Sequence, residues 1–239
     1  MRIVLVMLNN LQSYIFDNIK HLKKQGYSDI IIITDKKFNH LFKDNYVINI
    51  EDLIPDYINV ISTMCNTFRN GFWKLTSYRF VAIYEYMKQY NITNIIHIEN
   101  DVLIYKKIDN FHNTNKLLLT MDSKNRCIPG LMFIPNHNIL KKCLDIFSPS
   151  LNDMQNFSNC YYALGEWVDT LPIFIENNKN DVTNMITKNF KHYNAIFDAA
   201  AIGQYLGGVD PRNNAGDTIG FVNETCVIDY SKYTFIWKN

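Results

Sequence analysis

The fold is constrained most by short, largely apolar runs that alternate with segments of helical periodicity. Four such runs occur, at residues 3–8, 29–34, 46–50 and 94–98. A run without strict apolar–polar alternation is typical of a strand that is covered on both faces, as in a parallel sheet. Two stretches between them carry apolar stripes at helical spacing, residues 11–25 and 72–90. This order predicts an α/β fold with a Rossmann-like, mostly parallel sheet and helices on both faces.

The second half of the chain continues the pattern with a different spacing. We expect short strands at residues 116–122 and 129–135, and helices at 137–147 and 152–164, the last with Asn152 or Asp153 as its N-cap. With 239 residues and 47% hydrophobic content, the chain can bury a substantial core. Because no repeat or linker divides it, we expect a single domain, 1–239, built from two halves, 1–105 and 106–239.

Composition argues against several functional classes. A formal net charge of +1 gives no field that would attract nucleic acid or an anionic membrane. The five cysteines are scattered without CxxC spacing, so they indicate neither a zinc site nor a disulfide framework. No apolar run approaches the ~20 residues of a transmembrane helix, and the N-terminal run is too short for a signal peptide. We therefore expect a cytoplasmic protein that binds no nucleic acid, and we leave its oligomeric state open.

Two carboxylates, Glu99 and Asp101, directly follow the fourth apolar run. Asn9 and Asp35 likewise follow the first and second runs, and ligands of open α/β sheets bind outside the carboxyl ends of the strands. Alternate residues of a strand point to opposite sides, so acids at positions i and i+2 lie on the same side. Both could then reach one Mg²⁺ or Mn²⁺, or one acid could bind the ion and the other a ribose. The alternative is a solvated turn.

These residues, taken together with others, resemble the GT-A class of nucleotide-sugar glycosyltransferases. There, a DxD-type motif ends the fourth strand and binds a metal diphosphate; Glu99-Asn100-Asp101 would be this motif, with glutamate in its first position. Residues 129–134 (PGLMFI) resemble the glycine loop of the class, and Asn152-Asp153 resembles its acceptor-side acidic motif. Residues 197–211 (FDAAAIGQYLGGVDP) resemble a block from a bacterial and giant-virus branch of these enzymes.

The resemblance implies metal-dependent transfer of a sugar from a nucleoside-diphosphate sugar to a glycan or protein acceptor. Residues 1–105 would bind the nucleotide and 106–239 the acceptor, in the cytoplasm or, for a viral protein, in the host cytoplasm. Asp101 would be the main ligand of Mn²⁺ or Mg²⁺, with Glu99 on the metal's water shell or the ribose. The donor would be contacted by Asn9, Asp35, Arg79, Glu99, Asn100 and Gly130. Asp153 and Asp198 would be the catalytic residues, with Gln204, Glu166 and Asp169 as weaker candidates.

Several of these residues also have ordinary structural interpretations. Asp153 and Asp198 suit helix N-caps, and Arg79 suits the exposed face of an amphipathic helix. Many GT-A enzymes add a C-terminal histidine to the metal, whereas the last histidine here is His192. Either carboxylates, phosphates and water suffice for the cation, or the sequence belongs to a longer chain.

The sequence can also be compared with the requirements of three other functions. A non-catalytic glycan-binding module could use tyrosine and tryptophan side chains as sugar platforms. A sugar nucleotidyltransferase also uses a Rossmann-like sheet, but it needs a loop rich in glycine and basic residues after the first strand, and residues 8–14 (LNNLQSY) contain neither. A dehydrogenase is disfavoured because the same loop lacks GxGxxG.

Overall fold

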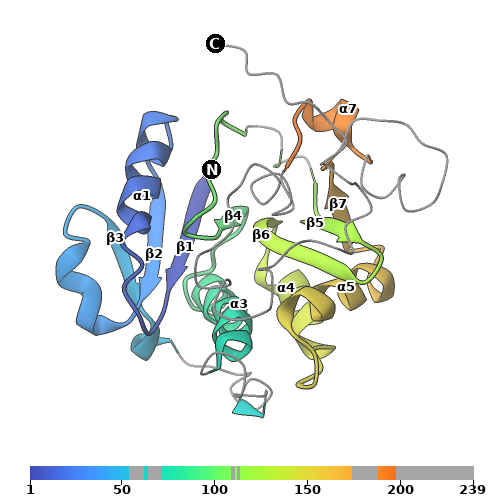
Figure 1. Ribbon diagram of the computed structural model, residues 1–239, viewed down its shortest axis with the longest axis horizontal. Helices are drawn as coiled ribbons and strands as arrows, with labels where there is room; N and C mark the ends of the chain where they lie inside the picture. The colour runs from blue at the N-terminus through green and yellow to red at the C-terminus, as the bar shows by residue number, and fades with distance from the viewer. Residues whose placement is uncertain (54–61, 64–70, 109–110, 112–113, 174–187, 198–239) are drawn as a thin grey trace, which may run out of the picture.

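The computed structural model describes residues 1–53, 62–63, 71–108, 111, 114–173 and 188–197. In this part of the chain, one sheet has the strand order β3-β2-β1-β4-β6-β5-β7 (Figure 1). Its strands are β1 (Arg2–Met7), β2 (Ile30–Thr34), β3 (Tyr46–Asn49), β4 (Ile95–Ile98), β5 (Leu117–Ser123), β6 (Arg126–Ile134) and β7 (Val168–Leu171). The α-helices are α1 (Tyr14–Lys24), α3 (Phe72–Gln89), α4 (His137–Asp145), α5 (Asp153–Ala163) and α7 (Phe190–Tyr193), and two 3₁₀ helices are η1 (Lys36–Leu41) and η2 (Ile50–Asp52).

The sheet is mixed but mostly parallel, which confirms the predicted α/β class. Strands β3, β2, β1 and β4 run parallel to one another, and β7 runs parallel to β5. Strand β6 is antiparallel to both β4 and β5. The carboxyl ends of β1, β2 and β4 therefore share one edge of the sheet, and β6 brings residues near its start to the same edge.

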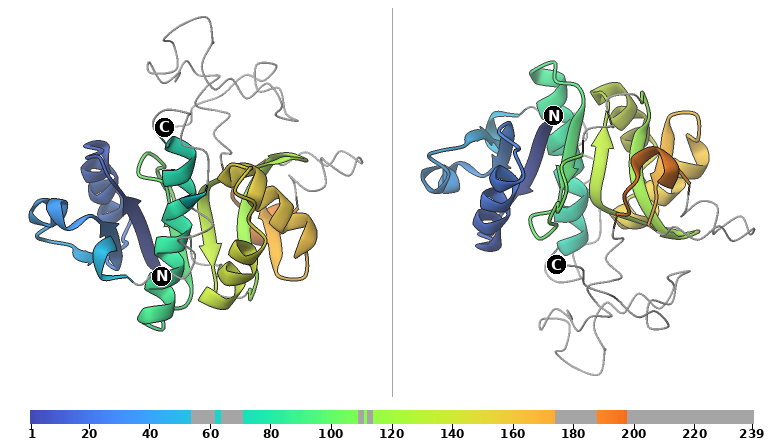
Figure 2. Two further views of the ribbon diagram at one scale, coloured as in Figure 1. Left: turned by 90° about the horizontal axis from the view of Figure 1, so that it is seen from below. Right: turned by 90° about the horizontal axis from the view of Figure 1, so that it is seen from above.

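Helices cover both faces of the sheet, as predicted. On one face, Val4, Ile31 and Ile95 pack in a core with residues of α3, α4 and α5. On the other face, Ile3 and Leu5 pack with α1. Full burial of such a side chain stabilises the fold by roughly 1.5–3 kcal/mol. The N-terminal elements, in blue, lie at one end of the sheet and α4, α5 and β7 at the other (Figures 1 and 2).

Local signals in the sequence locate most of these elements. Gly26, with φ +85°, follows α1, and Asn152 caps α5 by accepting a hydrogen bond from the Gln155 amide. Strand β7 and helix α7 were not predicted. The apolar run after Asp101 is irregular rather than the strand that its composition favours, because Val102 and its neighbours fold over α1 instead of joining the sheet. Most of the 197–211 segment lies outside the described residues.

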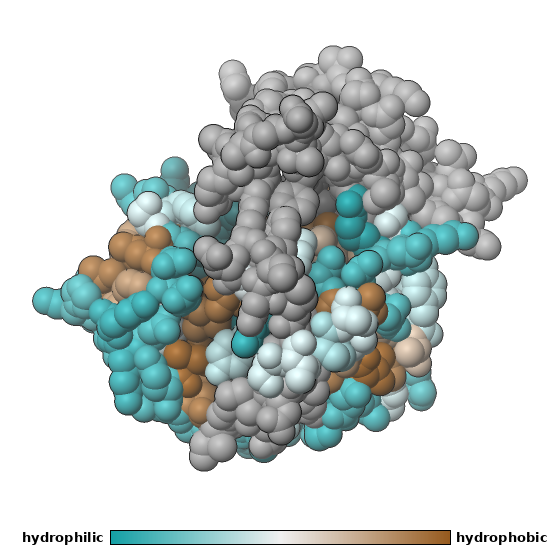
Figure 3. Space-filling view, turned by 60° about the horizontal axis from the view of Figure 1, so that its bottom comes forward, coloured by the Kyte–Doolittle hydropathy of each residue, from teal (hydrophilic) through white to brown (hydrophobic). Residues whose placement is uncertain are grey.

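The surface mixes polar and apolar residues. On the face drawn in Figure 3, hydrophilic areas separate the hydrophobic ones. Among the helices of the described residues, none combines the length and the hydropathy that crossing a membrane requires.

Candidate functional site

The acidic residues after β4 lie in a turn rather than in a strand. The Glu99 amide donates to the Gly130 carbonyl on β6 at 2.8 Å, and the Val102 amide donates back to the Glu99 carbonyl at 3.1 Å. Because β4 ends at Ile98, strand alternation does not place the carboxylates of Glu99 and Asp101 on the same side. This corrects the geometric argument from the sequence. Asp101 is exposed and the Glu99 side chain is 34% exposed.

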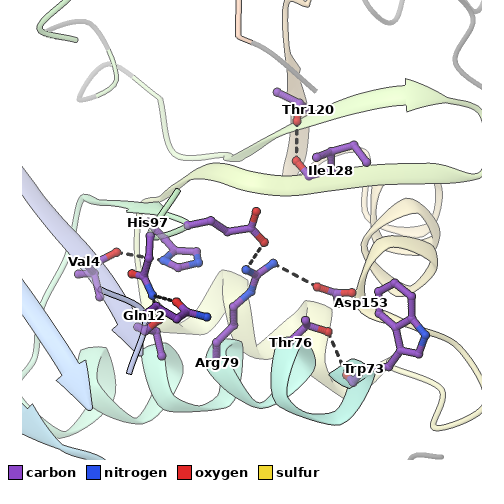
Figure 4. Close-up of polar contacts among 12 residues, drawn as sticks. Val4, Gln12, Trp73, Thr76, Arg79, His97, Thr120, Ile128 and Asp153 are labelled. Atoms are coloured by element: carbon purple, nitrogen blue, oxygen red, sulfur yellow. Dashed lines mark hydrogen bonds and ion pairs between the residues drawn. The ribbon is translucent and has the colours of Figure 1, made fainter. Parts of the chain in front are cut away.

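Arg79 connects this turn to helix α5. Its guanidinium extends from α3, donating through Nη1 to Glu99 Oε1 and through Nη2 to Asp153 Oδ2 at 3.1 Å. Figure 4 shows the Arg79 side chain pointing from α3 towards Asp153. Arg79 is 9% exposed and Asp153 2% exposed, so the interpretation of Arg79 as a surface arginine is wrong. Three segments distant in sequence therefore share one charge cluster, Arg79–Glu99–Asp153, in which Arg79 and Asp153 are buried and Glu99 is partly exposed.

The electrostatics of this cluster follow from burial and from its unequal charges. Burial opposes the charge on Arg79, but the carboxylates of Glu99 and Asp153 outweigh it and raise the arginine pKa. Burial raises the pKa of Asp153, and Arg79 only partly offsets this effect. Asp153 Oδ1 is buried without a hydrogen-bond partner. One cation thus faces two acids, and the cluster carries excess negative charge when both are ionised.

Gly130 makes room for the Glu99 side chain. A methyl group added at Gly130 would lie 3.2 Å from Glu99 Oε2 and 3.5 Å from Val102 Cγ2. That approach is tighter than ordinary van der Waals contact, so the carboxylate would have to move. The resemblance implies that Gly130 contacts the donor. In this structure the space is taken by Glu99.

Asn9 and Asp35 form a second contact at the same edge of the sheet. Asn9 has φ +70°, and its amide donates to Asp35 Oδ2 at 2.7 Å. Lys37, from η1, donates to the Asn9 carbonyl at 2.6 Å. The structure therefore brings a cation to the loop after β1, which has no basic residue of its own. Sequence analysis missed Lys37, because nothing local indicates that η1 folds back over β1.

Two buried amides hold the acidic turn from behind. Asn100, 5% exposed, donates to the Val6 carbonyl at 2.9 Å and to the Gln12 side chain. Asn18, on α1, donates to backbone carbonyls of the turn. Sequence analysis missed Asn18, although a signal was present: it is a polar residue within the apolar stripe of its helix.

The other predicted residues lie elsewhere. Glu166 is exposed, and Asp169 on β7 accepts a hydrogen bond from Lys188 at 2.7 Å. Asp198 and Gln204 lie outside the described residues. In the described part of the chain, no three His, Cys, Asp or Glu side chains are grouped to hold a metal ion. Glu99 and Asp101 carry carboxylate oxygens, the ligand type that Mg²⁺ and Mn²⁺ take together with water and phosphate, and the metal site stays a prediction.

Comparisons with known proteins add little beyond fold. The sequence matches no protein-family model and no curated protein sequence. A cytidylyltransferase structure from Leptospira borgpetersenii is 13% identical, with a TM-score of 0.44, over 76% of this chain and 77% of that one. A Bacillus anthracis structure assigned as a glucose-1-phosphate thymidylyltransferase is 10% identical, with a TM-score of 0.40, over 71% and 85%. The PaToxG glycosyltransferase is 12% identical, with a TM-score of 0.39, over 88% and 70%.

Proposed function

We propose that this protein is a metal-dependent glycosyltransferase that moves a sugar from a nucleoside-diphosphate sugar to a glycan or protein acceptor. The observation that carries the proposal is the Arg79–Glu99–Asp153 cluster at the carboxyl edge of the sheet. Burying the charges of Arg79 and Asp153 is costly, and buried groups with shifted pKa values gather at functional sites. Ligands of open α/β sheets bind at this edge.

The residues divide into a donor side and an acceptor side. Asp101 and Glu99 would hold Mn²⁺ or Mg²⁺, which neutralises the departing nucleoside diphosphate when bound. Asn9 and Asp35 lie at the adjoining edge of the sheet, where the nucleoside would lie, and Asn100 holds the acidic turn against β1. Arg79 keeps the Glu99 carboxylate in place and ties it to α5.

On the acceptor side, Asp153 is the candidate base or hydroxyl anchor. Its Oδ1 is the atom that lacks a partner, and burial raises the pKa of this carboxyl, which makes the carboxylate a stronger base. An acceptor hydroxyl would have to reach Oδ1 at hydrogen-bond distance. Asp153→Asn is then expected to lose transfer while donor binding survives; transfer at the wild-type rate would reduce Asp153 to a structural residue that anchors Arg79.

One observation favours a second candidate function. Lys37 contacts the loop after β1, where a sugar nucleotidyltransferase needs a cation to hold a nucleoside triphosphate. That enzyme would consume a nucleoside triphosphate and a sugar 1-phosphate, and would release pyrophosphate. Incubating the protein with each substrate pair and measuring pyrophosphate release against sugar transfer separates the two functions.

The proposal is tested by titrating the protein with a panel of nucleotide sugars, with and without Mn²⁺. We expect one nucleotide sugar to bind only when the cation is present, and Asp101→Asn to abolish this binding while the protein stays folded. Asp44→Asn is the matched control, because Asp44 is exposed and precedes β3 at the opposite edge of the sheet. Unchanged affinity in Asp101→Asn would reject the metal assignment. Binding of free glycans that needs neither nucleotide nor metal would instead indicate a glycan-binding module.

A further inference from the structure

Asn18 contacts the backbone of the acidic turn at three points. Its side chain is 1% exposed on α1, and its Nδ2 donates to the carbonyls of Glu99, Asn100 and Val102 at 3.3, 3.0 and 2.9 Å. One turn later on the same helix, His21 Nε2 lies 2.8 Å from the Ile104 carbonyl. One side of α1 thus holds the segment that follows β4.

The chemistry of this contact is specific to an amide. Three carbonyl oxygens that converge on one point can only accept hydrogen bonds, so the side chain facing them must donate. The amide nitrogen of Asn18 faces them with two hydrogens, while Asn18 Oδ1 is buried without a partner. The three carbonyls therefore orient the Asn18 amide, and its Oδ1 is left without a hydrogen bond. A carboxylate of the same shape would repel the three carbonyls. An apolar side chain would remove the donor from all three, and of these the Glu99 carbonyl would keep the Val102 amide.

We propose that Asn18 is a positioning residue that fixes the Glu99–Asp101 turn for cation and donor binding. This inference rests on the proposed function. The Asn18 hydrogen bonds hold the turn from α1, and the Asn100 side chain ties it to β1 at Val6. With its backbone held on both sides, the turn presents its two carboxylates without having to reorganise when the metal and diphosphate arrive. Residues that orient metal ligands in this way typically change metal affinity by about 10- to 100-fold when they are replaced.

The test compares Asn18→Asp and Asn18→Leu with the wild type. Affinity is measured by calorimetry for UDP, GDP, ADP and CDP, each with Mn²⁺, and hydrogen exchange is measured at the Val102 amide. We expect about a tenfold or greater loss of Mn²⁺-dependent nucleotide affinity in both variants, together with faster exchange at Val102. Asn136→Ala is the control, because it also removes a side-chain hydrogen bond, the N-cap of α4. Asn136 follows Ile134, which pairs with Ile95 at the end of β4 opposite to the acidic turn.

The outcomes separate this inference from the proposed function. If the wild type binds and both Asn18 variants bind equally well, the positioning role is overturned and the proposed function stands. If Asn136→Ala loses as much affinity as the Asn18 variants, the loss reflects general destabilisation and the positioning role is again overturned. If the wild type binds no Mn²⁺–nucleotide, the proposed function fails and this inference fails with it. That result comes from the wild type alone and needs no variant.

Discussion

At the scale of single residues, the geometry of Glu99 depends on what Gly130 lacks. We expect Gly130→Ala to displace the Glu99 carboxylate by a few tenths of an ångström, because the new methyl group would lie 3.2 Å from Glu99 Oε2. Mn²⁺-dependent nucleotide affinity should fall about tenfold. Gly165→Ala is the matched control, since its nearest neighbour would be the Tyr161 carbonyl at 3.6 Å, an ordinary contact. Equal affinities in the two variants would show that the space at Gly130 does not matter.

The buried side chain of His97 should make the stability of the fold depend on pH. It is 1% exposed, and its Nδ1 lies 3.0 Å from the Val4 carbonyl. Burial, with a contribution from Arg79, lowers its pKa from 6.5 to about 3. Between these values the unfolded chain binds a proton that the folded protein does not, so the free energy of unfolding decreases as pH falls, by at most about 1.4 kcal/mol per pH unit from this group.

The measurement is urea unfolding at pH 7 and at pH 4.5 for the wild type and His97→Leu. The variant has no imidazole to protonate, so its stability should fall less between the two pH values. If both proteins lose the same free energy of unfolding, His97 is not the group responsible.

The residues of the site could be predicted singly but not as a cluster. Glu99 is marked by its place after an apolar run, and Asp153 by its place at a helix start. Their meeting at Arg79 depends on how α3 and α5 pack on the sheet, and no local pattern encodes this packing. Lys37 reaches the loop after β1 for the same kind of reason. The sequence alone does not show that Gly130 makes room for Glu99, because a glycine occurs in a strand for several different reasons.

At the scale of elements, interior residues are better predicted than ends. Helix α5 begins where the sequence indicates, because the Asn152 cap is a local signal. Strand β4 ends at Ile98, before its acids, because the Glu99–Val102 turn competes with further pairing. Strand β7 consists of Val168–Leu171, too short a run to stand out from its neighbours.

Replacing Arg79, whose side chain connects α3 to the acidic turn and to α5, should strongly lower stability. Arg79→Met would leave the carboxylates of Glu99 and Asp153 without their cation while α3 keeps most of its packing. Removing one partner of a buried ion pair costs about 3–5 kcal/mol, and we expect a loss of this size in urea unfolding. Lys141→Met is the control, because it breaks the exposed Lys141–Asp145 pair, which contributes about 0.5 kcal/mol or less.

A double variant identifies the physical cause of that loss. Arg79→Met combined with Asp153→Leu removes the cation together with its more deeply buried acid, so much of the lost free energy of unfolding should return. If the double variant is less stable than Arg79→Met alone, the packing of the arginine side chain outweighs its charge.

At the scale of the whole molecule, apolar runs predicted the class of sheet but not its directions. The parallel pairing of β3, β2, β1 and β4 was predicted from alternating strands and helices in the first half of the chain, whereas their order was not. The reversal at β6 does not, because a continuous apolar run shows only that both faces are covered, whichever way the strand points. This reversal matters to the site, since it places Gly130 against Glu99 rather than at the opposite edge.

The few protein ligands at the predicted metal site suggest an order in which metal and nucleotide bind. Both predicted ligands, Glu99 and Asp101, lie on one turn, and Glu99 already contacts Arg79. Across the ranges that the structure describes, no three His, Cys, Asp or Glu side chains are grouped around a possible ion. Two carboxylates, one of them shared with an arginine, leave most of the usual six positions around Mn²⁺ or Mg²⁺ to water and phosphate. The nucleotide should therefore bring most of the metal's ligands.

Calorimetry tests this order directly. Mn²⁺ titrated into the protein alone should bind weakly, and the same titration with a saturating nucleoside diphosphate should show a much tighter site, because the phosphate oxygens complete the coordination shell. Asp101→Asn should remove the second site, and Asp44→Asn should keep it. Tight Mn²⁺ binding without nucleotide would contradict the two-carboxylate site and would require further protein ligands.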